Sequence, residues 1–134
     1  MDYGAVLTFL QGAFSELKAV YLFGSQAAGT ARPDSDVDLA VFANDRKDAV
    51  AYWELANEVA LIVGRDVDLV DLTTASTVMQ HQIITTGKRI WVSDKPGDKL
   101  ATDLYELFIL NEKMRLDELR AGIIEDVMKR GHVL

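Results

Sequence analysis

Residues 24–42, GSQAAGTARPDSDVDLAVF, contain the most informative pattern in this chain. The apolar run before them, AVYLF (Ala19–Phe23), is short, continuous and ended by Gly24-Ser25, so it predicts a buried strand rather than a helix. In DVDLAVF (Asp36–Phe42), acidic and small residues alternate with Val37, Leu39 and Val41, and this period of two predicts a second strand. The loop between the two strands is rich in small residues, and its QAA segment can open a helix whose N-terminus favours an anion.

Helices and strands alternate along the rest of the first 92 residues. We predict a helix from about Asp2 to Lys18, a helix capped by Asn44 or Asp45 and running to about Val63, a strand over Val67–Leu72, a helix capped within Thr73–Ser76 and ending at Thr86, and a short strand over Arg89–Val92. Gly64 and Gly87 fit the two helix ends. On the helix ending at Val63, one apolar side is expected to consist of Val50, Trp53, Ala56, Ala60 and Val63. This alternation predicts an α/β fold with a small sheet of about four strands and packed helices.

The C-terminal segment is helical almost to its end. A single helix from Lys99 to Lys129 would be about 46 Å long, which exceeds the width of a domain of this size, so we expect a break near Asn111 or an overhang. Two apolar sets either pack on the sheet or dock a partner: Leu100, Leu104, Leu107, Phe108 and Leu110, then Leu116, Leu119, Ile123 and Val127. We therefore divide the chain into an α/β domain (1–95) and a C-terminal helical extension (96–134), which packs on that domain and is a candidate partner-binding element.

Composition limits the classes of function. The 134 residues, 49% apolar and 26% charged, suit one globular domain. A formal charge of -7 disfavours a stable nucleic-acid partner, although it leaves room for a single nucleotide carried by metal ions. Cysteine is absent, which excludes disulfides and Cys-ligated zinc. No run of about 18 apolar residues suggests a membrane span, and we expect a cytoplasmic protein.

Acidic residues recur on two strands. In an extended strand Asp36 and Asp38 lie on one face, with Cα atoms roughly 6.6 Å apart. On the next strand Asp66 and Asp68 share a face, and Asp68 completes a cluster of three if the strands are neighbours, with Asp66 as its rival. Two like charges about 4 Å apart repel by about 4 kcal/mol at an effective dielectric constant near 20, so three need divalent cations or raised pKa values. Oxygen ligands without thiols favour Mg²⁺ or Mn²⁺ over zinc.

Gly24-Ser25 gives the carboxylates a possible partner. Gly24 allows close approach of a phosphate, and the Ser25 hydroxyl can donate to phosphate oxygens. Two cations would then hold a triphosphate for in-line displacement. Each feature has a simpler explanation, because Ser25 alone fits a helix N-cap and alternate acidic residues fit a solvated strand face.

Together these residues resemble a known family. The spacing Gly-Ser, ten residues, Asp-x-Asp is similar to the signature of the DNA polymerase β-like nucleotidyltransferases, and VDLVDL (67–72) resembles the strand bearing their third carboxylate. The short chain and the run VDLVDLTTASTVMQHQIITTGKRIW look most like the minimal nucleotidyltransferase (MNT) antitoxins, of the MntA type, of HEPN/MNT toxin–antitoxin modules. The resemblance implies a mixed sheet and transfer of AMP from ATP to a tyrosine hydroxyl of a HEPN ribonuclease toxin, which silences it.

Residue roles follow from the same resemblance. Gly24 and Ser25 would bind the nucleotide phosphates, Asp36 and Asp38 would hold two Mg²⁺ or Mn²⁺ ions, and Asp68 would bind one ion and help deprotonate the acceptor hydroxyl. Two alternatives remain open at this point: an antitoxin that acts by binding alone, and a nucleotidyltransferase acting on a small hydroxylated molecule.

Basic residues and histidines give weaker signals. Arg32 could reach a triphosphate but fits an exposed loop. Lys88 and Arg89 could aid nucleotide binding or complement a helix dipole. His81 fits a surface or packing role, and His132 lies in a terminal tail.

Overall fold

The computed structural model describes residues 3–32 and 34–130, so His132 and the predicted helix start at Asp2 lie outside the described residues. Its elements are α1 (Tyr3–Ala13), β1 (Leu17–Phe23), α2 (Gly24–Ala28), β2 (Val37–Ala43), α3 (Ala49–Val63), β3 (Val67–Asp71), α4 (Thr77–Thr86), β4 (Lys88–Val92) and α5 (Asp98–Arg130). The predicted α/β class and the four strands are confirmed. The first helix is shorter than predicted, because Leu17 and Lys18 belong to β1.

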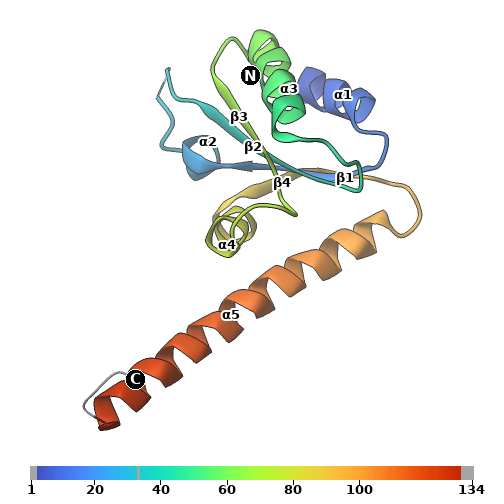
Figure 1. Cartoon of the computed structure of the whole chain (residues 1–134). Helices are drawn as coiled ribbons and strands as arrows, with labels where there is room; N and C mark the ends of the chain where they lie inside the picture. The colour runs from blue at the N-terminus through green and yellow to red at the C-terminus, as the bar shows by residue number, and fades with distance from the viewer. Residues whose placement is uncertain (1–2, 33, 131–134) are drawn as a thin grey trace.

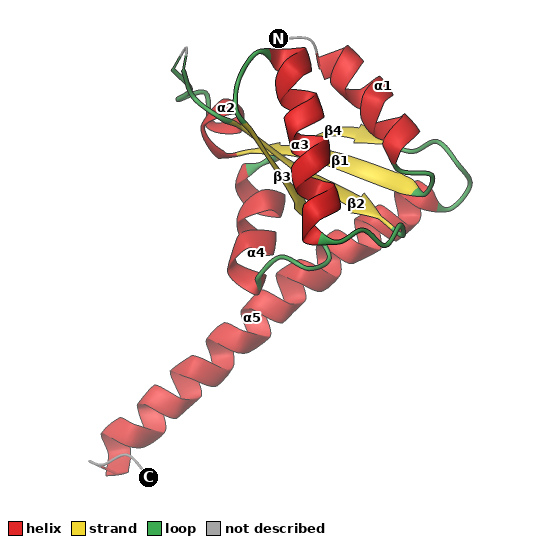
Figure 2. Cartoon of the chain, turned by 45° about the horizontal axis from the view of Figure 1, so that its top comes forward, coloured by secondary structure: helices red, strands yellow, loops and turns green. Residues whose placement is uncertain are grey.

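The sheet is mixed, with strand order β3-β2-β1-β4. β1 is antiparallel to both β2 and β4, whereas β2 and β3 are parallel. Helices α1 and α3 cover one face of the sheet, and α4 with the first half of α5 covers the other (Figures 1 and 2). β2 is buried from both sides, since Val37, Leu39 and Val41 pack toward α1 and α3 while Ala40 and Phe42 pack toward α4 and α5.

Helix α3 is capped and rotated differently from the prediction. Asp48 is its N-cap and accepts a hydrogen bond from the Ala51 N–H at 2.8 Å, so capping by Asn44 or Asp45 is wrong. The buried residues are Tyr52, Ala56 and Val59, whereas Val50 and Trp53 are exposed. Two apolar stripes overlap at Ala56, and packing against the sheet, rather than the helical period, decides which stripe is buried.

Asp45 instead holds the turn that leads into β1. Its carboxylate accepts hydrogen bonds from the Ser15 N–H and hydroxyl and from the Glu16 N–H, at 2.9 to 3.0 Å. Partial burial alone would raise the pKa of Asp45, but these hydrogen bonds outweigh it and lower the pKa below its ordinary value of 3.8.

A pH dependence of stability follows from this turn. Because the pKa of Asp45 is lower in the folded than in the unfolded chain, its contribution is complete above pH 3.8 and disappears as the pH falls through the folded value. We expect Asp45→Asn to lower stability at pH 7 and to change it less near pH 3, as measured by urea denaturation at both pH values. An equal loss at both would contradict this assignment.

Helix α5 runs unbroken from Asp98 to Arg130, so the predicted break at Asn111 is absent and the predicted overhang is present (Figure 1). Thr102 and Ile109 are fully buried, and the Tyr105 ring stacks on Phe42 with centroids 4.8 Å apart. Packing of both apolar sets on the sheet is wrong, because six of their members are more than half exposed: Leu100, Leu104, Leu107, Phe108, Leu119 and Ile123. The side chain of Val127 lies outside the described part of the chain.

A charged network fastens α5 to the sheet. Arg89 of β4 donates to Asp103 at 2.8 Å and to Glu106, and Glu106 also accepts a hydrogen bond from the Tyr21 hydroxyl at 3.0 Å. The Asp103 hydrogen bond raises the pKa of Arg89 further. Arg89 therefore has a structural role, which the sequence did not predict.

Removal of this guanidinium should destabilise the fold. Arg89→Ala leaves the half-buried Glu106 without its cationic partner, and we expect a loss of about 1 to 2 kcal/mol in the free energy of unfolding. Lys99→Ala is the matched control, because Lys99 pairs with the same Asp103 on the exposed surface, where such pairs contribute little to stability. Equal losses in urea denaturation would argue against the network as an anchor.

Candidate active site

The motif residues meet at the end of the sheet where β1 finishes and where β2 and β3 begin, here named the Gly24-Ser25 edge. β1 ends at Phe23, and Phe23 is the register partner of Asp38 near the start of β2. Asp38 is in turn the register partner of Asp68 on β3. Because β1 is antiparallel to β2 and β3, its C-terminal end and their N-terminal ends lie together, and α2 begins at this edge (Figure 1).

Gly24 lies directly against Asp38. Its φ of +70° is in the left-handed region that L side chains rarely adopt. A Cβ at this position would overlap Oδ2 of Asp38 and lie 3.1 Å from its Cγ. The glycine is therefore required twice, by the sharp turn from β1 into α2 and by the carboxylate packed against it.

Two of the predicted carboxylates act on the third, Asp38. Partial burial, then the charge of Asp68, then that of Asp36 raise the pKa of Asp38 above 3.8. Asp38 and Asp68 point to the sheet face covered by α4 and α5, because the alternate residues Val37 and Leu39 pack on the other face. Asp66 precedes β3, and its carbonyl accepts a hydrogen bond from the Val37 N–H. This geometry favours Asp68 over Asp66 as the third member.

The donor set fits a divalent cation. In residues 3–32 and 34–130, no three His, Asp or Glu side chains already have the arrangement of a metal site. Asp36 and Asp68 are exposed at strand ends, so their side chains can rotate toward Asp38. Clustered carboxylates without thiols are the ligands that Mg²⁺ and Mn²⁺ prefer.

The remaining predicted residues fall in different places. Ser25 lies inside α2, whose N-cap is Phe23, so the N-cap interpretation of Ser25 is wrong. Arg32 is exposed and lies in a turn, where its N–H donates to Ser35. Lys88 is exposed at the start of β4 and pairs in register with Leu22, two residues before Gly24. His81 is half-buried on α4.

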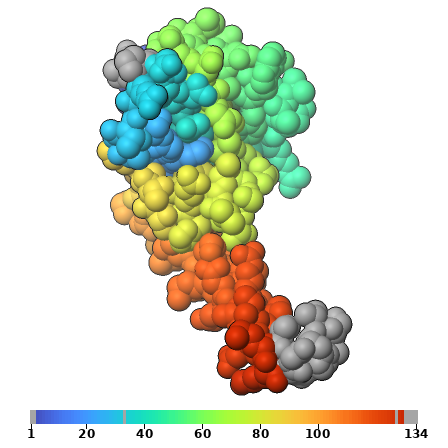
Figure 3. Space-filling view, turned by 90° about the vertical axis from the view of Figure 1, so that its left-hand side faces the viewer, coloured from blue at the N-terminus to red at the C-terminus, as the bar shows by residue number. Residues whose placement is uncertain are grey.

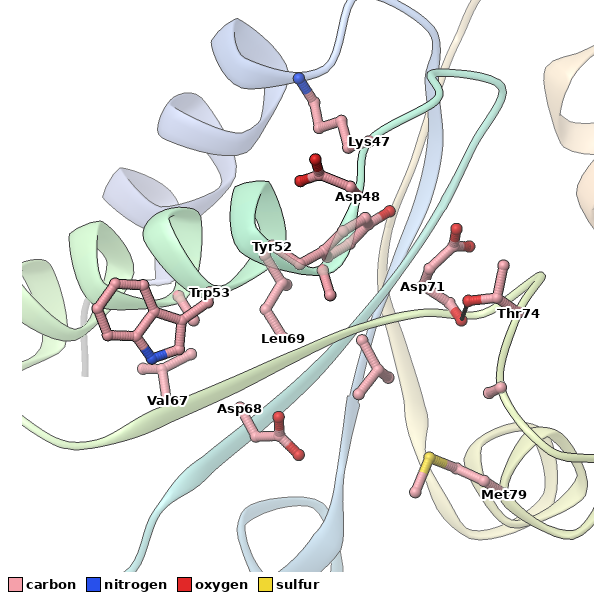
Figure 4. A pocket seen from close by; sticks show the side chains of 14 residues that line it. Lys47, Asp48, Tyr52, Trp53, Val67, Asp68, Leu69, Asp71, Thr74 and Met79 are labelled. Atoms are coloured by element: carbon pink, nitrogen blue, oxygen red, sulfur yellow. Dashed lines mark hydrogen bonds between the residues drawn. The ribbon is translucent and has the colours of Figure 1, made fainter.

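A groove that the sequence did not predict lies beside Asp68. It has a volume of about 580 Å³. Its floor is β3, and its walls come from α3 and from the segment leading into α4 (Figure 4). Lining residues include Tyr52, Trp53, Val67, Leu69 and Met79 together with Asp68. The predicted apolar side of the helix includes Trp53, which is 66% exposed and lines this groove.

Comparisons with known proteins agree with this geometry. The family model described as polymerase beta, nucleotidyltransferase matches residues 7–96. The protein adenylyltransferase MntA of Shewanella oneidensis is 39% identical over 123 residues, which cover 92% of this chain and 85% of that protein.

Two solved structures match over nearly the whole chain. A toxin–antitoxin with AMP-PNP has a TM-score of 0.80 at 38% identity, covering 96% of this chain and 99% of the matched one. A tri-AMPylated HEPN toxin of Shewanella oneidensis in complex with an MNT antitoxin has a TM-score of 0.73 at 35% identity, covering 93% and 94%. The fold, the edge where the motif residues meet and these matches lead to one conclusion: the chain belongs to the polymerase beta nucleotidyltransferase family.

Proposed function

We propose that this chain is an antitoxin with protein adenylyltransferase activity. It transfers AMP from ATP to a tyrosine hydroxyl of a cognate HEPN toxin and so neutralises the toxin. The observation that carries the proposal is the edge where Gly24 packs against Asp38 and Asp38 pairs with Asp68. The names of the relatives support the same activity, since one is a protein adenylyltransferase and another is bound to an AMPylated toxin.

Each motif residue has a role in this reaction. Gly24 and Ser25 bind the phosphates of ATP, and Asp36, Asp38 and Asp68 hold Mg²⁺, with Mn²⁺ as a substitute. The bound cations neutralise charge that develops on the phosphoryl oxygens. The acceptor oxygen forms a bond to the α-phosphorus, the bond to the bridging oxygen breaks, pyrophosphate leaves, and Asp68 accepts the hydroxyl proton.

The long helix provides a second way to engage the partner. The exposed apolar residues of α5 favour a docking role for the extension (96–134), alongside catalysis by residues 1–95. No described helix has the length and apolarity needed to cross a membrane. We infer that the reaction takes place in the cytoplasm, where ATP is available.

Co-expression with the product of the neighbouring gene tests the proposal. We expect that product to gain mass in multiples of one AMP, as measured by intact mass spectrometry. Asp36→Asn combined with Asp38→Asn should abolish the gain, whereas Asp34→Asn, a change in the exposed turn before β2, should preserve it. Growth rescue by the double variant would instead support an antitoxin that acts by binding alone.

A further inference from the structure

The proposed reaction, on which this inference rests, fixes the side from which the acceptor arrives. In an in-line displacement the attacking oxygen and the leaving oxygen lie on opposite sides of the phosphorus. Gly24 and Ser25 follow β1, so the pyrophosphate leaves on the β1 side of Asp38. Because β2 lies between β1 and β3, the acceptor hydroxyl approaches from the β3 side, where Asp68 is.

β3 is an edge strand and is open to a partner. It occupies one end of the sheet order, and no described strand pairs with its outer side. Backbone N–H and C=O groups on such an edge can pair with an extended segment of another chain. Figure 3 shows the side of the molecule that carries α2. Below this side, the overhang of α5 projects toward the viewer. A partner that lies along α5 can therefore reach this side of the molecule.

The groove along β3 has the composition of a protein-binding surface. Trp53 on α3 is 66% exposed, and together with Val67 and Leu69 it makes one side of the groove apolar (Figure 4). Exposed tryptophans of this kind are common energetic centres of protein interfaces. Lys47, Asp48, Asp71 and Thr74 add polar groups to the rest of its lining.

We propose that this groove is the acceptor site and that it binds an extended segment of the protein that receives AMP. The segment lies along β3 and packs an apolar side chain against Trp53. Its hydroxyl residue lies beside Asp68, where the oxygen bonds to the α-phosphorus, pyrophosphate departs, and the proton passes to the carboxylate. The groove therefore selects the protein that accepts AMP, whereas the Gly24-Ser25 edge selects ATP, which donates it.

Two substitutions on opposite walls test this assignment. Trp53→Ala removes the exposed indole, and Thr74→Arg, at an exposed position, places a long side chain across the groove. For AMP transfer to the cognate HEPN toxin, we expect kcat/KM to fall at least about 10-fold for each variant. Binding of ATP with Mg²⁺, measured calorimetrically without the toxin, should stay within about 2-fold of wild type, because neither residue belongs to the Gly24-Ser25 edge. Leu61→Ala is the matched control, since Leu61 lies on the same helix, is 80% exposed and does not line the groove.

The outcomes separate this inference from the proposed function. Transfer by both groove variants at the wild-type rate overturns the acceptor site and leaves the adenylyltransferase activity standing. No transfer by the wild-type chain overturns both. A loss of ATP binding in either variant would assign the groove to the nucleotide, and a change in the chain's own oligomeric state would assign it to a second copy. Either result overturns the inference.

Discussion

Asp38→Asn is expected to abolish AMP transfer and, in buffer without divalent cations, to raise the thermal midpoint of unfolding. Losing a carboxylate that holds the cations should cost about 4 kcal/mol of transition-state stabilisation, a rate loss of about a thousand-fold. The stability gain has a separate cause, because burial and the charges of Asp68 and Asp36 disfavour ionised Asp38 in the folded chain. A neutral amide of the same shape removes both penalties.

Calorimetric melting with and without Mg²⁺ checks this pair of effects. Mg²⁺ should raise the midpoint of the wild-type chain and leave that of Asp38→Asn almost unchanged. The control is Asp34→Asn, in the exposed turn before β2, which should change neither the rate nor the midpoint. An active Asp38→Asn chain, or one that melts at a lower temperature without Mg²⁺, would refute the carboxylate cluster.

Gly24→Ala is expected to have the second largest effect on transfer. An alanine must adopt a positive φ, which costs about 1 to 2 kcal/mol, and its Cβ would overlap the Asp38 carboxylate. Since Asp38 must move, we expect the transfer rate to fall at least about 100-fold, beyond any loss of folded protein.

Gly29→Ala separates the cost of a positive φ from the effect of the contact with Asp38. Gly29 ends α2 with a φ of +73°, but a Cβ there meets no atom within 4 Å. This variant should therefore lose only the stability that the positive φ costs, as measured by urea denaturation, and retain most of its transfer rate. Equal transfer rates in the two alanine variants would show that the contact between Gly24 and Asp38 is unimportant.

The local parts of the site could be predicted because they depend on neighbours in the sequence. Alternation along the run Asp36–Phe42 predicts that Asp36 and Asp38 share one face, and the run ending at Gly24 predicts the strand and the turn after it. The choice between Asp66 and Asp68 could not be made in this way. It depends on the register between β2 and β3, which pairs Asp38 with Asp68 through contacts far apart in sequence.

Long-range packing also explains the errors. Asn44 and Asp45 are good caps by type, but Asp45 is held by Ser15 and Glu16, so the helix begins after Asp48. Trp53 fits an apolar stripe, yet the sheet buries the stripe of Tyr52 and Val59 and leaves the indole in the groove.

For this chain, residue order alone determined the strands, the glycine turn and the acidic pairs, because hydrophobic periodicity and φ preferences act over a few residues. Tertiary structure decided which acidic residue pairs in register with Asp38, which side of α3 faces solvent, and whether α5 bends or projects. Those outcomes depend on strand register and on how much helix surface the sheet can cover. Neither quantity exists until distant segments pack together.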